Sequence, residues 1–266
     1  MPVTRVPVPI ALTIAGSDPS GGAGLQADLK TFHQHGAYGM AVVTLITVQN
    51  TRAVSRVDVL DAGLVREQLE AVLDDVPPHA LKTGALGNAA VIGAVAKVLA
   101  KVKVPVVVDP VMISKHGHAL LAADAHRTLV EELLPVCSLV TPNADEAAAL
   151  TGLKVTTVAE AEVAARALAT RGPKAVLVKG GHLAEEREAV DVLFAEGQVT
   201  LFRAPRVVSQ HTHGTGCSSS AAITALLAKG VPLVEAVGLA KEWLGRALAS
   251  PPEVGRGIGP VNHLVR

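Results

Sequence analysis

Short apolar runs alternate along the chain with longer segments in which apolar residues recur at the spacing of a helix. Nearly continuous runs such as Val104–Asp109 predict strands buried on both faces, which is typical of a mostly parallel sheet. The alternation predicts right-handed crossovers and helical layers on the sheet. The predicted strands are Ile10–Ala15, Ala41–Thr47, His79–Lys82, Val104–Asp109, Leu139–Thr141 and Lys174–Lys179, and the predicted helices are Leu25–His35, Gly63–Asp74, Asn88–Lys101, Ala123–Leu134 and Val158–Thr170.

The last third of the chain departs from this alternation. Ala189–Ala195 and Val199–Arg203 have the pattern of two strands around a glycine, which predicts an antiparallel hairpin at one edge of the sheet. Helices are expected at Thr215–Lys229 and Pro232–Ala249, before a tail rich in Gly and Pro. No repeat, low-complexity linker or shift in composition marks a boundary, so we expect a single domain over residues 1–266.

The charge balance excludes several classes of function. Twenty-four Lys and Arg balance twenty-four Asp and Glu, whereas binding to nucleic acids or anionic membranes generally needs a basic surplus. No apolar run approaches the ~18 residues of a membrane span, and the N-terminus lacks the apolar core and cleavage site of a signal peptide. We therefore expect a cytoplasmic protein with neither nucleic-acid nor membrane partners.

The cysteines and histidines form no pattern typical of a disulfide or zinc site. Cys137 and Cys217 lie eighty positions apart, which favours a reducing compartment. No spacing among the histidines supplies a third or fourth zinc ligand, so we assign them mostly to surface and loop positions. Three close pairs occur, His33/His35, His116/His118 and His211/His213, of which His213 alone stands out by its location.

Candidate chemistry lies in the loops that follow strands, because ligands of such folds bind outside the carboxyl ends of the strands. The first loop, Gly16–Gly24, is rich in glycines that allow close approach of the backbone to a ligand. It fails the P-loop template, because Gly22 stands where the lysine should be. Gly22–Ala27 matches a dinucleotide fingerprint, but no acidic residue follows about twenty positions later, which disfavours that fold. The alternative is a tight turn between strand and helix.

Two polar residues near this loop have both a structural and a functional interpretation. Asp28 is either a solvated helix carboxylate or a substrate contact, and Gln49 is either a backbone tether or a substrate contact.

Three later loops carry charged or amide side chains. Asp109 directly follows a buried strand, so it is either a contact to a divalent cation or part of an Asp-Pro turn. Asn143 and Glu146 have the spacing of a capping box, or they lie on one helix face and hold a hydrated Mg²⁺. Lys179 ends a strand before two glycines, which suits either phosphate contact or a solvated terminus.

The stretch from His211 to Ser220 is the most informative. Gly214 and Gly216 stand at a predicted helix start, where exposed backbone amides and the helix dipole would hold an anion. Cys217 falls in the first turn, so we expect a lowered thiol pKa and a thiolate able to take a proton from an attacking hydroxyl. The alternative for Cys217 is a small buried apolar residue, which is the role expected for Cys137.

Six motifs in this order resemble one family. ALTIAGSDPSGGAGLQADLKTF, VVDPVM, VTPNADEA, VLVKGGH, THGTGC and GPVNH together resemble the hydroxymethylpyrimidine/phosphomethylpyrimidine kinases of the ribokinase-like superfamily. The resemblance implies a three-layer α/β/α sandwich with a central, mostly parallel sheet, no separate lid domain and usually a homodimer. It also implies that ATP, with Mg²⁺, phosphorylates 4-amino-5-hydroxymethyl-2-methylpyrimidine and then its monophosphate to the diphosphate, in thiamine biosynthesis.

The resemblance also assigns roles to residues. The pyrimidine would be held by Gly16, Ala23, Asp28 and Gln49, and the phosphates and magnesium would be organised by Asp109, Asn143 and Glu146. The nucleotide would contact Lys179 and Thr212. The anion hole would be formed by Gly214, Thr215 and Gly216, and the catalytic base would be Cys217. An amide such as Gln49 can pair with a ring nitrogen and an exocyclic amine.

The chain departs from the family pattern at three positions. Ala85 stands where the family commonly has Met, which changes one wall of the pyrimidine pocket. His211 replaces a more usual Asn, and Ser218 replaces a Thr while keeping a hydroxyl at the helix start.

The sequence leaves two alternatives to this pyrimidine kinase function: a pyridoxal kinase of the same branch, or a catalytically silent protein that senses the pyrimidine.

Overall fold

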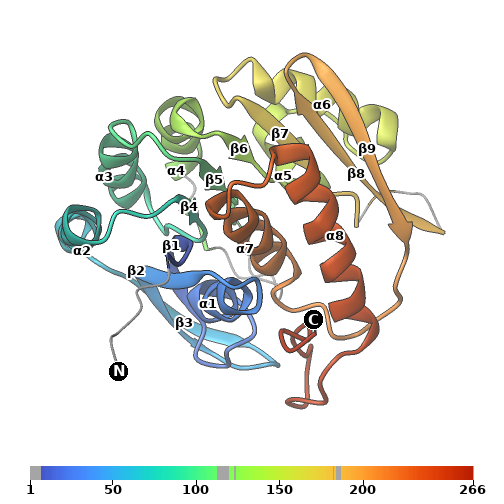
Figure 1. Cartoon of the computed structure of the whole chain (residues 1–266), viewed down its shortest axis with the longest axis horizontal. Coiled ribbons are helices and arrows are strands. Elements are labelled where there is room, and N and C mark those ends of the chain that lie inside the picture. Colours follow the sequence, from blue (N-terminus) through green and yellow to red (C-terminus); the bar gives the residue numbers. More distant parts are fainter. Residues whose placement is uncertain (1–6, 113–119, 123, 182, 184–186, 266) are drawn as a thin grey trace.

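The computed structural model describes residues 7–112, 120–122, 124–181, 183 and 187–265. Its strands form one nine-stranded sheet in the order β3-β2-β1-β4-β5-β6-β7-β8-β9 (Figure 1). The strands are β1 Ile10–Ser17, β2 Tyr38–Gln49, β3 Val54–Val59, β4 Ala80–Thr83, β5 Val106–Val108, β6 Leu139–Val140, β7 Ala175–Val178, β8 Glu188–Ala195 and β9 Gln198–Pro205. All described strands share this sheet, whereas the prediction of one domain over residues 1–266 includes undescribed residues and stays a prediction.

The six central strands are parallel, and both edges of the sheet are antiparallel. The predicted hairpin is confirmed as β8–β9, with Ala195 paired to Gln198 at the turn. The prediction of an antiparallel addition at one edge is incomplete, because β3 pairs antiparallel with β2 at the other. Polar and apolar residues alternate from Arg56 to Val59 after a short polar turn, a short pattern that could have predicted this strand.

Helices connect the strands and cover both faces of the sheet. They are α1 Gly24–Gln34, α2 Ala62–Asp75, α3 Ala89–Leu99, α4 Ala125–Thr128, α5 Ala144–Thr151, α6 Val158–Ala169, α7 Thr215–Ala228 and α8 Leu233–Ala249, with a π-turn η1 Leu129–Leu133 and a 3₁₀ turn η2 Leu134–Val136. The helix predicted at Ala123–Leu134 is therefore α4 continued by η1 and the start of η2; Ala123 itself lies outside the described residues. The other predicted helices agree with the structure apart from their exact ends, whereas α5 was anticipated only as a helix start at the Asn143 capping box.

Alternate side chains of the buried strands enter two separate cores, which explains the nearly continuous apolar runs. Val106 and Val108 pack in the core beneath α2 to α6, whereas Val107 faces the core beneath α7 and α8. Phe32 of α1 packs with alanines of α7 on this second face. The three-layer α/β/α architecture is thus confirmed (Figure 1).

Helix α7 lies at the centre of its layer, between α1 and α8. A helix without a polar face must be buried all round, and nearly every residue from Ser218 to Ala228 is buried. Some of its hydroxyls bond within the helix; Thr224 Oγ1, for example, donates to Ser220 O at 2.7 Å. The burial fixes the direction of α7, so its N-terminus points at the carboxyl edge of the sheet. Within the described ranges, no helix has both the length and the apolar character needed to cross a membrane.

Candidate active site

A cavity of about 720 Å³ opens at the carboxyl ends of the parallel strands. Its lining includes all the residues singled out as site residues: Gly16, Ala23, Asp28, Gln49, Asp109, Asn143, Glu146, Lys179, Thr212, Gly214, Thr215, Gly216 and Cys217. The fold brings them together because they lie at the ends of strands, in the loops that follow, or in the first turns of the next helices. Their placement agrees with the sequence analysis, and their chemical roles stay predictions.

The N-terminus of α7 packs against the glycine-rich loop after β1. Gly214 is the N-cap residue with φ 78°, in the left-handed region that favours glycine, and a Cβ there would strike the carbonyl oxygen of Gly22. Thr215 Oγ1 donates to Thr212 O at 2.6 Å and holds the turn. The N–H groups of Gly216 and Cys217 belong to the first helical turn, where an α-helix supplies no internal partner. This geometry suits an anion.

Cys217 differs electrostatically from the prediction. Burial raises the pKa of its thiol to about 12, and the carboxylates of Asp28 and Asp109 add to the rise against the opposing charge of Lys82. The expected lowering of the thiol pKa is therefore wrong for the free protein, because desolvation outweighs the helix N-terminus. Cys137 is buried in the core, and burial raises the pKa of its thiol to about 12, which confirms an inert packing role.

Asp28 is completely buried, and the interpretation as a solvated helix carboxylate is wrong. Its Oδ1 accepts from Lys82 Nζ at 2.8 Å and its Oδ2 accepts from Thr13 Oγ1 at 2.6 Å. Burial raises the pKa of Asp28, and the ion pair offsets part of that rise. Burial acts to lower the pKa of Lys82, but the negative charge of Asp28, with that of Asp109, outweighs it and raises the pKa. Lys82 therefore keeps its charge inside the protein.

Sequence reasoning missed Lys82 as a site residue. Its signal was a lysine inside the apolar strand β4, Ala80–Thr83, whose four residues are all buried. A buried lysine needs an anionic partner, and Asp28 one turn into α1 supplies it.

Asp109 and Lys179 form a second ion pair across the cavity. Lys179 Nζ donates to Asp109 Oδ1 at 2.9 Å, and Ser220 Oγ of α7 donates to Oδ2 at 3.2 Å. Burial acts to raise the pKa of Asp109, but Lys179 and Lys82 outweigh it and lower the pKa. Lys179 is thus no solvated terminus, and Asp109 does more than begin an Asp-Pro turn.

Asn143 and Glu146 form the complete capping box of α5. Asn143 Oδ1 accepts from Glu146 N and Glu146 Oε2 accepts from Asn143 N, each at 2.8 Å. The structural interpretation is therefore correct, but both residues also line the cavity. Burial raises the pKa of Glu146 to about 7, with Lys179 opposing the rise and Asp109 adding to it.

The carboxylates of Asp109 and Glu146, which both line the cavity, fit a hydrated magnesium ion. Mg²⁺ is usually held by one or two carboxylates, with water and phosphate oxygens completing its coordination. Burial raises the pKa of Glu146 by disfavouring its charged form, and a divalent cation beside the carboxylate would oppose that effect. In the part of the chain that the structure describes, no three His, Cys, Asp or Glu side chains gather as ligands for a metal ion.

On the side of β8 and α8, the cavity wall combines apolar surface with a third ion pair, whose side chains are largely but not fully buried. Lys241 Nζ lies 2.9 Å from Asp191 Oδ2, and Asp191 Oδ1 accepts from Gly180 N at 2.8 Å. Arg206 also donates to Gly181 O at 2.6 Å. Asp191, Lys241 and Arg206 were missed, although a lone Asp in the apolar run of β8 could have indicated one of them.

The side chain of Gln49 contacts His213 in the loop before α7, so the interpretation of Gln49 as a backbone tether is not supported. Its amide nitrogen lies 3.2 Å from His213 Nε2, and the same imidazole nitrogen lies 2.8 Å from Asp18 Oδ2. His213 and Asp18 are both buried. Neither was predicted as a site residue, and the position of His213 in the loop before α7 was the only indication.

The three residues that depart from the family pattern, Ser218, His211 and Ala85, each make defined contacts in the structure. Ser218 Oγ and His263 Nε2 form a hydrogen bond at 2.9 Å, and burial lowers the pKa of His263 to about 4, so the ring is neutral. His211 packs closely on Gly259, where a Cβ would strike its ring. Ala85 O accepts from Thr44 Oγ1 at 2.6 Å, and Ala85 lines the cavity. His116, His118 and His182 lie outside the described residues.

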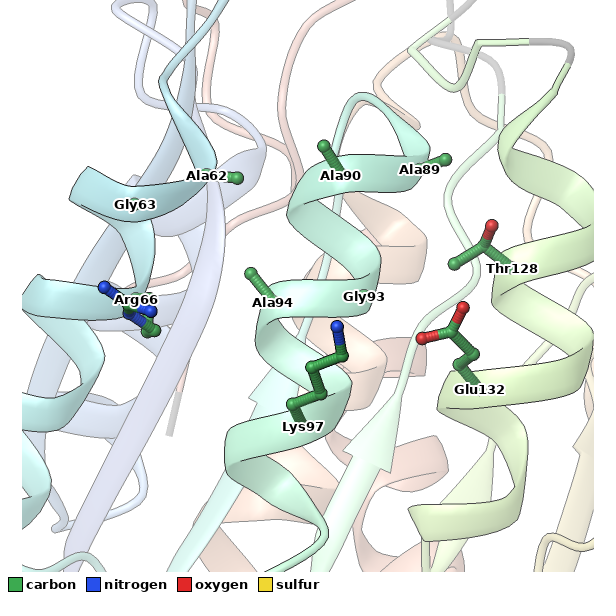
Figure 2. A pocket seen from close by; sticks show the side chains of 10 residues that line it. All are labelled: Ala62, Gly63, Arg66, Ala89, Ala90, Gly93, Ala94, Lys97, Thr128 and Glu132. Carbon is green, nitrogen blue, oxygen red and sulfur yellow. The ribbon is translucent and has the colours of Figure 1, made fainter.

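A second hollow, of about 510 Å³, lies on the outer helical layer. Figure 2 shows it along α3, where Ala89, Ala90, Gly93 and Ala94 leave space between α2 and the helical turns of α4 and η1. None of the predicted site residues lines this hollow, so the chemistry belongs to the larger cavity.

The fold and the cavity together are those of an α/β phosphotransferase, since a helix N-terminus, lysines and carboxylates line one cavity. The comparisons agree. The family model for phosphomethylpyrimidine kinase matches residues 18–262, and the chain belongs to that family. A hydroxymethylpyrimidine/phosphomethylpyrimidine kinase of Streptomyces coelicolor is 46% identical over 262 residues, which are 98% of this chain and 97% of the relative.

Two solved structures are similar over most of the chain. The phosphomethylpyrimidine kinase of Clostridium difficile is 42% identical with a TM-score of 0.79, covering 89% of this chain and 98% of that one. An ADP complex of Bacillus subtilis pyridoxal kinase is 36% identical with a TM-score of 0.90, covering 97% and 98%. The predicted family and fold are therefore confirmed.

The buried pair of Lys82 and Asp28 makes a prediction about stability. Lys82→Met leaves the Asp28 carboxylate buried without its cation, and we expect a loss of about 3–5 kcal/mol in the free energy of unfolding. The double variant Lys82→Met/Asp28→Leu removes both charges and should recover at least half of that loss. Urea unfolding measures both, and a double variant as unstable as the single one would contradict the account.

Glu146 makes a prediction about pH. Because its pKa rises from 4.5 to about 7 on folding, the linked stabilisation is complete below pH 4.5 and is lost as the pH rises through 7. Relative to Glu146→Gln, the wild-type chain should lose up to about 3 kcal/mol of unfolding free energy between pH 4.5 and pH 8. Glu242→Gln, at an exposed position on α8, is the matched control. Parallel pH curves for wild type and Glu146→Gln would show that burial of Glu146 has no such effect.

Proposed function

We propose that the chain transfers the γ-phosphoryl group of ATP to the hydroxymethyl group of 4-amino-5-hydroxymethyl-2-methylpyrimidine, and then phosphorylates the monophosphate to the diphosphate, in thiamine biosynthesis. The observation that carries the proposal is the position of Cys217 at the α7 N-terminus, between the Asp28–Lys82 pair and the Asp109–Lys179 pair in one cavity. The names of the similar kinases support the substrate, and the ADP complex of a similar pyridoxal kinase supports the nucleotide.

The acceptor side of the cavity would be formed by Gly16, Ala23, Asp28 and Gln49. The glycine loop allows the ring to approach the backbone, and Gln49 can pair with a ring nitrogen and the neighbouring amine. The hydroxymethyl group would then face Cys217. A sulfur with a raised pKa is a strong base once ionised, and Lys82 is the buried cation that opposes its protonation.

The donor side would hold the phosphates of ATP. Thr212 and Lys179 would contact the nucleotide, and the amides of Gly214, Thr215 and Gly216 would receive the migrating phosphoryl group. Asp109, Asn143 and Glu146 would organise the phosphates, with Asp109 and Glu146 as the carboxylates that hold Mg²⁺. When bound, the ion supplies positive charge against the negative charge that spreads over the phosphoryl oxygens.

A homodimer in the cytoplasm is part of the proposal. Tyr38, Ile46 and Val48 of β2 are half-exposed or more, and a second copy would cover apolar surface of this kind. The free thiols of Cys137 and Cys217 suit a reducing compartment.

The alternative acceptor is pyridoxal, which the likeness to the Bacillus subtilis enzyme favours. We expect ATP consumption with the hydroxymethylpyrimidine and its monophosphate to exceed that with pyridoxal, measured side by side at equal concentrations. Faster turnover of pyridoxal would overturn the choice of substrate, and binding of the pyrimidine without ATP consumption would indicate a sensor.

Cys217 makes the sharpest prediction about the reaction. Cys217→Ala should lower kcat by about 10²–10⁴-fold, because a positioned base typically contributes that much, while pyrimidine affinity changes by less than about threefold. Cys137→Ala, at a cysteine in the core, should keep kcat. Steady-state kinetics and calorimetric titration measure the two quantities, and near-wild-type turnover of Cys217→Ala would remove the thiol as base.

A further inference from the structure

The carboxylate of Asp18 is surrounded by hydrogen-bond donors. Oδ1 accepts from Ser20 N at 2.9 Å and from Ser20 Oγ at 2.7 Å, while Oδ2 accepts from Gly22 N at 3.2 Å and from Ala23 N at 2.8 Å. Burial acts to raise the pKa of Asp18, but the hydrogen bonds from His213 and Ser20 outweigh it and lower the pKa. Asp18 is therefore an ionised group that only accepts hydrogen bonds.

The state of Asp18 determines the tautomer of His213. His213 Nε2 lies 2.8 Å from Asp18 Oδ2, and an unprotonated nitrogen would place two lone pairs against each other at that distance. Nε2 must therefore carry a hydrogen and donate it. Once protonated, this nitrogen has no lone pair in the ring plane with which to accept a hydrogen from Gln49.

The neighbours of Gln49 determine the orientation of its amide. With Gln49 Nε2 facing His213 Nε2 at 3.2 Å, two donors oppose each other. Turning the amide by 180° instead places Oε1 beside the imidazole N–H, as a second acceptor of the hydrogen that Asp18 Oδ2 also accepts. Thr47 selects the same orientation. Its only hydroxyl hydrogen is donated to Ser17 O at 2.8 Å, so its contact with the amide at 3.2 Å is best met by an N–H of Gln49.

We propose that His213 is a positioning residue which, held by Asp18, fixes the Gln49 amide with its oxygen toward the imidazole and its nitrogen toward Thr47. This inference rests on the proposed function, because it concerns how the acceptor ring is read. Fixed in this way, the amide keeps one N–H donor and one oxygen lone pair for a ligand. The donor and the acceptor cannot change places, because the amide cannot turn over.

This order selects a class of acceptor ring. The hydroxymethyl group must face Cys217, so the ring cannot turn over to match an amide of the wrong polarity. A ring with an acceptor nitrogen beside a donor amine then fits, whereas the 4-oxo analogue presents a ring N–H beside a carbonyl oxygen and opposes each group of Gln49 with its like. A site built to hydrogen-bond one pattern rejects the reversed pattern strongly.

The test compares the affinities of the 4-amino ring and its 4-oxo analogue by calorimetric titration of the full chain. Wild type should prefer the 4-amino ring by at least about tenfold, since two hydrogen bonds are exchanged for two repulsive contacts. His213→Met keeps the length of a glutamine side chain but donates nothing, so the amide can turn and the preference should fall below about threefold. His213→Gln restores a donor at this position and should restore the preference.

Two further variants separate positioning from a general structural effect. In a Gln49→Met background, His213→Met should change the preference no further, because it acts through Gln49. A preference that His213→Met leaves unchanged, or that falls equally in His213→Gln, would overturn the proposal. So would a wild-type chain that binds both rings equally, a result that needs no variant to fold. Wild type that binds neither ring would instead overturn the proposed function, and with it this role of His213.

Discussion

The site depends on a contact between two glycine-containing loops that lie nearly two hundred residues apart in the sequence. Gly214 approaches the carbonyl of Gly22 so closely that no side chain fits, and its positive φ of 78° turns the chain into α7. The position of the helix N-terminus relative to the β1 loop follows from this contact. The same approach brings His213 within hydrogen-bond distance of Asp18.

Beneath this contact, buried charges alternate in sign across the cavity. Asp28 pairs with Lys82 at 2.8 Å, and Asp109 pairs with Lys179 at 2.9 Å. The charge of Lys82 also acts to lower the pKa of Asp109, and the charge of Lys179 acts to lower the pKa of Glu146. Buried ion pairs seldom increase stability over apolar residues of the same size, because both charges lose their hydration. Under the proposed function these pairs have a chemical use: they would provide fixed charges where a phosphoryl group must be neutralised.

Much of this arrangement follows from local sequence patterns. Apolar runs identified the central strands, and polar residues after them identified the cavity edge, because parallel strands end on one side. The thiol pKa of Cys217 could not be predicted, since desolvation depends on how α1, β4 and α7 enclose the sulfur. Lys82 and Asp18 were missed for a related reason: their partners, Asp28 and His213, are brought close only by folding. Strand β3 was missed because its short alternating pattern is weak without its neighbour β2.

The central claim is that the amides at the α7 N-terminus receive the phosphoryl group while Cys217 faces the acceptor hydroxyl. A crystal structure of the chain with a non-hydrolysable ATP analogue, Mg²⁺ and the pyrimidine measures this most directly. The account predicts the terminal phosphate within hydrogen-bond distance of the Gly216 N–H, and the hydroxymethyl oxygen between that phosphate and Cys217 Sγ. A terminal phosphate bound elsewhere, or a pyrimidine whose hydroxymethyl group points away from Cys217, would contradict it.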